Sequence, residues 1–151
     1  MHTLGNKELT NLHKFGYFAS SKIASLSVLP TLDWATEIAK REDVAIISGF
    51  HSKMEKEVLN HLLKGKCGII CVLARGIYKQ IPAKYKEAFH NNRVLFISLE
   101  SDKTLNYGRE QTAKRNEFIA STADELVFSS VTPNSSLFAI YRSVTKPKHI
   151  L

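Results

Sequence analysis

The chain has 151 residues, of which 44% are hydrophobic and 23% charged, a composition typical of a globular domain with a sizeable core. No run approaches the roughly 18 apolar residues that a membrane-spanning helix needs, so we expect no membrane partner. Lysine and arginine number 21 against 14 aspartates and glutamates, a net charge of +7, which favours a polyanionic partner, nucleic acid first. The N-terminal residues lack the apolar segment and cleavage site of a secretory signal, so we expect a cytoplasmic protein.

Apolar periodicity and turn residues predict the elements in chain order. They are a helix within 6–14, a strand over 15–20, a serine-rich loop, a helix opened by Pro30, a strand over 44–49, a helix from Ser52 to Gly65, a strand over 67–73, a helix over 83–92, a strand over 93–99, a polar loop over 100–111, a helix over 112–123, a strand over 125–131 and a helix over 135–144.

Strands and helices alternate along this chain, which is typical of βαβ units. The strand 67–73 is apolar without alternation, as a strand covered on both faces tends to be. We therefore expect one domain over residues 1–151, an α/β protein built as a three-layer α/β/α sandwich around a mostly parallel sheet of five or more strands. Ligands of such sheets bind beyond the carboxyl ends of the strands.

Two cysteines, Cys67 and Cys71, lie in one predicted strand, where they are too far apart to form a disulfide bond. We expect both to be reduced core residues. The glycine patterns that bind dinucleotides and nucleoside triphosphates are absent, so neither NAD binding nor ATP hydrolysis is predicted. We expect no cofactor and no metal.

The corner between the strand 44–49 and the next helix is the first candidate site. Ser52 and Glu55 have the spacing of a capping box, which is a structural role; the alternative is a ligand-facing Glu55 carboxylate. Gly49, which follows Ser48, permits close backbone approach next to a helix N-terminus, an arrangement suited to phosphate. His51 is either an exposed or capping residue or a hydrogen-bond donor to phosphate or base.

Further candidates follow other strands. Arg75 and Gly76 come directly after the strand 67–73, where arginine can bind phosphate through two hydrogen bonds, and Lys22 holds a comparable place after 15–20. Within the helix 112–123 the pattern places Asn116 among core-facing alanines. It either fixes a neighbouring loop or, with Lys114 and Arg115, lines the same cleft as residues 48–52.

Four segments, "IISGFHSKMEKEVL", "LARGI", "KRNEFIASTADELVF" and "TPNSSL", resemble the Rossmann-like domain of the DNA-processing protein A family over about residues 14–142. The resemblance implies a pocket for single-stranded DNA. Its residues would be the turn Ser20-Ser21-Lys22, the corner of Ser48, Gly49, Phe50, His51, Ser52 and Glu55, the helix start at Arg115-Asn116-Glu117, and the turn Asn134-Ser135-Ser136-Leu137.

The resemblance also implies a function in natural transformation and recombination, with a recombinase as a partner. Domains of this kind commonly form homodimers. We expect a binding module for single-stranded DNA or nucleotide phosphate rather than an enzyme. The alternative is a nucleotide sensor or a phosphoribohydrolase-like enzyme acting on a nucleoside monophosphate, with Glu55 as acid/base or ribose ligand. The hydrolases of the same superfamily carry a glycine-rich loop where this chain has "VTPNSS", so hydrolysis ranks below binding.

Overall fold

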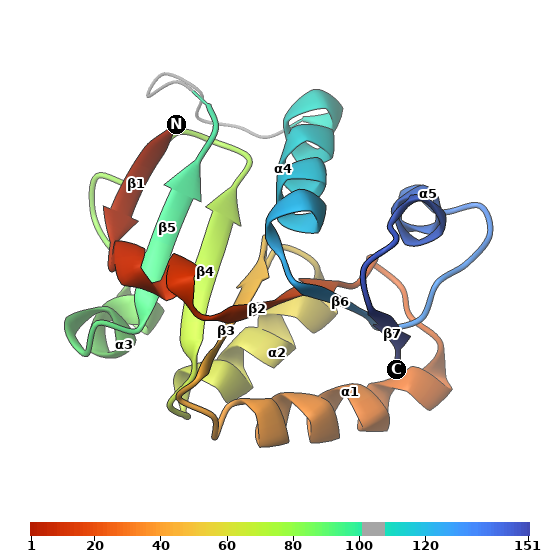
Figure 1. The fold of residues 1–151 in the computed structure, drawn as a ribbon, viewed down its shortest axis with the longest axis horizontal. Helices are drawn as coiled ribbons and strands as arrows, with labels where there is room; N and C mark the ends of the chain where they lie inside the picture. Colours follow the sequence, from red (N-terminus) through yellow and green to blue (C-terminus); the bar gives the residue numbers. More distant parts are fainter. Residues whose placement is uncertain (101–107) are drawn as a thin grey trace.

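The computed structural model describes residues 1–100 and 108–151, which form one seven-stranded sheet with helices on both faces (Figure 1). The strand order is β1-β5-β4-β3-β2-β6-β7. Only β1 runs antiparallel, against β5; every other neighbouring pair is parallel. The strands are β1 (His2–Gly5), β2 (His13–Phe18), β3 (Val44–Ser48), β4 (Gly68–Leu73), β5 (Val94–Ser98), β6 (Glu125–Phe128) and β7 (Lys148–Ile150).

The helices form the two outer layers. They are the 3₁₀ helices η1 (Lys7–Asn11) and η2 (Ala83–Tyr85) and the α-helices α1 (Ser25–Ile38), α2 (Lys53–Leu63), α3 (Lys86–His90), α4 (Arg109–Thr122) and α5 (Ser136–Ser143). In Figure 1, α1 and α2 run beneath the sheet and α4 stands above it. The predicted three-layer α/β fold with a mostly parallel sheet is therefore confirmed.

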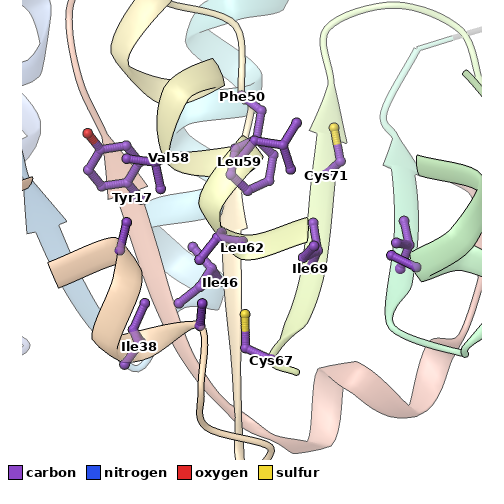
Figure 2. Close-up of a cluster of buried hydrophobic side chains, with 14 of the residues drawn as sticks. Tyr17, Ile38, Ile46, Phe50, Val58, Leu59, Leu62, Cys67, Ile69 and Cys71 are labelled. Atoms are coloured by element: carbon purple, nitrogen blue, oxygen red, sulfur yellow. The ribbon is translucent and has the colours of Figure 1, made fainter. Parts of the chain in front are cut away.

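Each face of the sheet has its own apolar core. Figure 2 shows the first, in which Val58, Leu59 and Leu62 of α2 pack toward Ile46 and Ile69 of the sheet. The second core lies on the other face, where residues of α4, α5 and η1 pack on alternate strand residues. Because β3, β4 and β5 carry apolar side chains on both faces, they are buried along their whole length.

Helix α1 begins at Ser25, so the prediction that Pro30 opens it was wrong: Pro30 lies inside the helix. The first turns bury Ser27 and Thr31 rather than apolar residues. The Thr31 hydroxyl is 2.6 Å from the Ser129 hydroxyl. Because this face of α1 is buried through polar side chains, apolar periodicity does not indicate where the helix begins.

Other boundaries also differ from the sequence-based predictions. Two edge strands, β1 and β7, were not predicted, because three or four residues carry too little pattern. Helix α4 begins at Arg109 rather than near Thr112. Of the predicted polar loop 100–111, residues 101–107 lie outside the described part of the chain.

Both cysteines are free and buried, as predicted. Burial raises the pKa of each thiol to about 11. Each side chain is therefore a thiol at neutral pH and acts as a small core residue. Among the helices that the structure describes, none has the length and apolar character required to span a bilayer.

The chain direction brings the candidate loops together. From β2 the chain runs through β3 and β4 to β5, then returns through α4 to β6 on the other side of β2. In parallel sheets the crevice beyond the carboxyl ends at such a reversal is the common place for a ligand. The loops after β2 and β3 and the first half of α4 all border this point.

Candidate functional site

Two adjoining cavities lie at the carboxyl edge of the sheet, and His51 and Arg115 line both of them. One, of about 260 Å³, is the serine cavity, with Ser21, Ser52 and Ser136 in its wall. The other, of about 230 Å³, is the tyrosine cavity, with Tyr78 and Tyr85 in its wall. Together they form a cleft divided by the His51 and Arg115 side chains.

Arg115 is the central cation of this cleft and is only 7% exposed. Its Nε and Nη2 both donate to Asn116 Oδ1 at 3.3 Å. In the described part of the chain this amide is its only hydrogen-bond acceptor, and no carboxylate forms an ion pair with it. A buried guanidinium normally has a carboxylate or several carbonyl partners, so Arg115 retains donors for an anion.

The sequence placed Asn116 in the core, and this prediction was wrong. Asn116 is half-buried, and Ala113, assigned to the same face, is exposed. The buried face of α4 is formed by Arg115, Ile119 and Ala120. An arginine can bury its aliphatic stem, so residue type alone did not distinguish this face. Asn116 positions the Arg115 guanidinium instead of fixing a loop.

Gly49 makes the position of Arg115 possible. A Cβ atom added at Gly49 would lie 2.7 Å from Cζ and Nε of Arg115, well inside van der Waals contact. The residue of this corner with positive φ is Phe50, at 47°. Its amide donates to the Ser48 hydroxyl at 3.2 Å. Gly49 therefore provides close approach, and the buried Ser48 supports the turn beneath the cleft.

The capping box at the start of α2 is confirmed. Ser52 Oγ accepts from the Glu55 amide, and Glu55 Oε1 accepts from the Ser52 amide at 3.1 Å and the His51 amide at 2.9 Å. Glu55 Oε2 accepts from the Ala19 amide at 3.0 Å. The carboxylate thus joins the ends of β2 and β3 through three backbone donors, although it also borders the serine cavity.

His51 lies between the two cavities. Burial lowers the pKa of its imidazole, and the nearby positive charges of Arg115 and Lys56 lower it further. At neutral pH the ring is therefore neutral. A neutral imidazole beside a cationic guanidinium is compatible with an oxyanion that brings its own negative charge.

Arg75 lines the tyrosine cavity, as expected for the end of β4. Its guanidinium carbon lies 4.9 Å from the centre of the Tyr78 ring, and its Nε donates to the Gly76 carbonyl at 3.2 Å. The Ser98 hydroxyl donates to the Arg75 carbonyl. Gly76 is buried and lines neither cavity. Its carbonyl instead fixes the position of the Arg75 side chain.

Two predicted cations do not line either cavity. Lys22 is exposed in the loop after β2, where its carbonyl accepts a hydrogen bond from the Ser20 hydroxyl at 2.8 Å. Lys114 pairs with the buried Glu100 at 2.7 Å, and this hydrogen bond raises the pKa of the Lys114 ammonium. The charge of Lys114 is therefore largely balanced within the protein.

Several cleft residues were not predicted: Lys56, Tyr78, Lys84, Tyr85 and Thr112. The two tyrosines and Lys84 lie in the connection between β4 and β5. No sequence motif indicated that this connection passes beside the cleft. Lys56 follows Glu55 by one residue, and the i, i+4 spacing from Ser52 could have placed it on the same end of α2. No cluster of three metal-ligating side chains occurs within residues 1–100 and 108–151.

The fold and cleft define a Rossmann-like α/β protein with a basic, partly closed cleft at the carboxyl edge of its sheet. Solved structures with the same fold include DNA processing protein A from Streptococcus pneumoniae, with a TM-score of 0.76 and 15% identity, covering 98% of this chain and 53% of that one. DNA processing protein A from Helicobacter pylori, which binds single-stranded DNA, has a TM-score of 0.77 and 16% identity, covering 98% of this chain and 69% of that one.

The resemblance found in the sequence motifs therefore holds at the level of the fold. This chain spans about half the length of the Streptococcus pneumoniae protein. No protein-family model matches the chain, and no curated protein matches it.

Proposed function

We propose that the cleft binds the phosphate backbone of single-stranded DNA. The observation that carries this proposal is the buried Arg115, a residue only 7% exposed, whose guanidinium has an amide and no carboxylate as its partner among the described residues. A desolvated cation without a counter-charge is costly. A phosphate oxygen would supply that charge, and the planar guanidinium can donate two hydrogen bonds to it.

The remaining cleft residues suit the same ligand. The neutral His51 ring lines the cleft without adding a charge of its own, and Arg75 adds a second cation on the tyrosine side. Ser21, Ser52 and Ser136 present hydroxyl groups in the serine cavity, a residue type that commonly contacts DNA phosphates. The net charge of +7 assists the approach of a polyanion.

The finer parts of the proposal come from the resemblance to DNA processing protein A. They are a function in transformation and recombination, a recombinase partner, a homodimer and a cytoplasmic location. We also propose that residues 1–151 form a single domain, because one sheet extends from β1 to β7.

A nucleoside monophosphate is the alternative ligand, and it would occupy the same cleft. Three backbone donors already engage the Glu55 carboxylate, which argues against this group as an acid/base catalyst. Incubation with nucleoside monophosphates, followed by chromatography, tests this alternative. Release of free base would favour a hydrolase over the binding module.

Fluorescence anisotropy with a labelled oligothymidine tests the main proposal. We expect Arg115→Ala to weaken binding by roughly tenfold or more and to lower the salt slope by about 0.7, the contribution of one phosphate contact to a single strand. Arg142→Ala is the matched control, because Arg142 is exposed on α5 and packs on Phe138. Absence of oligonucleotide binding to the wild-type protein at low salt would refute the proposal.

A further inference from the structure

A second hollow lies at the opposite edge of the sheet, near the amino ends of β4 and β5. This amino-edge groove has a volume of about 990 Å³ and runs between α2 and α3. Asn60 of α2 and Lys64, the residue that follows its last turn, border one side, and Lys84, Ala88 and Asn91 border the other. No residue assigned to the cleft by its sequence motifs lies in it.

The outward face of α2 connects the cleft with the groove. Lys56, Asn60 and Lys64 are spaced by four residues, so they form one row along the helix. Lys56 lines the tyrosine cavity, whereas Asn60 and Lys64 line the groove. The row extends about 12 Å, at about 1.5 Å of rise per residue.

Lys84 joins the two hollows from the other side, because it lines both the tyrosine cavity and the amino-edge groove. Its ammonium lies 5.7 Å from the centre of the Tyr85 ring. The Lys56 charge also contributes to the lowered pKa of His51, which places it within electrostatic range of the cleft. We call the surface formed by Lys56, Asn60, Lys64 and Lys84 the α2–α3 seam.

The groove contains further charges, and one of them, the exposed Lys66, follows Lys64 by two residues and adds to the positive charge of the seam. Arg93 lies in the groove, but its guanidinium donates to the carbonyls of Leu62, Leu63 and Cys67. Glu42 and Glu87 also line the groove and would repel phosphate. The cationic path is therefore formed by Lys56 and Lys64 along α2, by Lys66 just beyond it and by Lys84, and Glu87 of α3 opposes it.

We propose that a single strand held at Arg115 continues along the α2–α3 seam, with its phosphates on Lys56, Lys84 and Lys64. This inference rests on the proposed function of the cleft and adds the direction in which the strand leaves it. A strand too short to leave the cleft gains nothing from Lys64 and Lys66, which line only the groove, whereas a longer strand gains counterion release at each of them. Dependence on strand length is thus the signature of the seam.

The test compares oligothymidines of about four and about sixteen nucleotides by anisotropy at low salt. We expect Lys64→Ala/Lys66→Ala, which changes two lysines of the groove and none of the cleft, to weaken binding of the longer strand by roughly three- to tenfold and to reduce its salt slope by about 1.4. Binding of the shorter strand should stay within about twofold, as judged by the same salt arithmetic. Lys64→Arg/Lys66→Arg should keep most of the affinity, and Glu87→Gln should strengthen binding of the longer strand.

Lys86→Ala/Arg142→Ala is the control of equal charge, because both residues are exposed and line neither hollow. An equal loss of affinity for both strand lengths, or no loss of affinity for the longer strand, would refute the proposed path along the seam but not the proposed function of the cleft. Failure of the wild-type protein to bind either strand would instead overturn the function proposed for the cleft. Protection of α2 amides from hydrogen exchange by the longer strand alone is an independent supporting result.

Discussion

Arg115 at the carboxyl edge of the sheet and Arg93 at the amino edge are the same residue type in opposite situations. Arg93 donates three hydrogen bonds to main-chain carbonyls, two of them in the last turn of α2. Arg115, although buried, donates only to the Asn116 amide within the described chain. Arg93 lines the larger hollow and Arg115 lines the two smaller cavities, so the size of a hollow does not by itself show which arginine retains hydrogen-bond donors for a ligand.

The largest expected effect separates the two arginines by stability. Arg93→Met should lower the free energy of unfolding by about 2–4 kcal/mol, because buried carbonyls lose charged donors. Arg115→Met should leave it unchanged or raise it, since a desolvated charge without a counter-ion is removed. Urea unfolding followed by circular dichroism measures both.

The control for Arg93→Met is Arg41→Met, since Arg41 is an exposed arginine that pairs with Asp43 at 2.9 Å. It should change stability by less than about 1 kcal/mol. If Arg115→Met were as destabilising as Arg93→Met, Arg115 would be a structural residue and the contrast would fail.

Gly49→Ala should act on the Arg115 site without breaking the fold. The new methyl group would meet the flexible end of the Arg115 side chain, which can move at little cost in packing. We expect DNA affinity to fall by about tenfold, or 1.4 kcal/mol, while the unfolding midpoint changes little. Anisotropy and thermal unfolding on one preparation measure the two quantities, and unchanged affinity would show that the Arg115 position is unimportant for binding.

The smallest expected effect concerns pH. Burial and the charges of Arg115 and Lys56 lower the His51 pKa in the free protein, while Glu55 acts in the opposite direction. A bound phosphate would favour protonation. Affinity should therefore increase a few-fold as pH falls from about 8 to about 6, and His51→Gln should remove much of this dependence. A steeper dependence in the variant would contradict this role of His51.

The lowered His51 pKa also has a consequence for the unliganded protein. Because the folded state disfavours protonation relative to the unfolded state, this contribution to stability is present above the usual histidine pKa and is lost as pH falls below it. The protein without ligand and the complex should thus respond to acid in opposite directions at this residue.

Whether a region could be predicted from the sequence depends on whether its residues interact with neighbours along the chain or with distant residues. The central strands β3, β4 and β5 were predictable because burial on both faces requires uninterrupted apolar runs. The start of α2 was predictable because a capping box is a local interaction between residues three apart. The first turns of α1 were not predictable in this way, because Thr31 is buried through contact with Ser129, 98 residues away.

The sequence by itself determined the alternation of strands and helices, the α2 cap and the excess of positive charge, since these depend on composition and on neighbours along the chain. Only the tertiary structure decided that Arg115 rather than Asn116 faces inward, that Gly49 makes room for its guanidinium, and that Glu100 pairs with Lys114. Those outcomes depend on which distant side chains share a space. A buried cation becomes a candidate ligand site when the fold removes it from water and supplies no opposing charge.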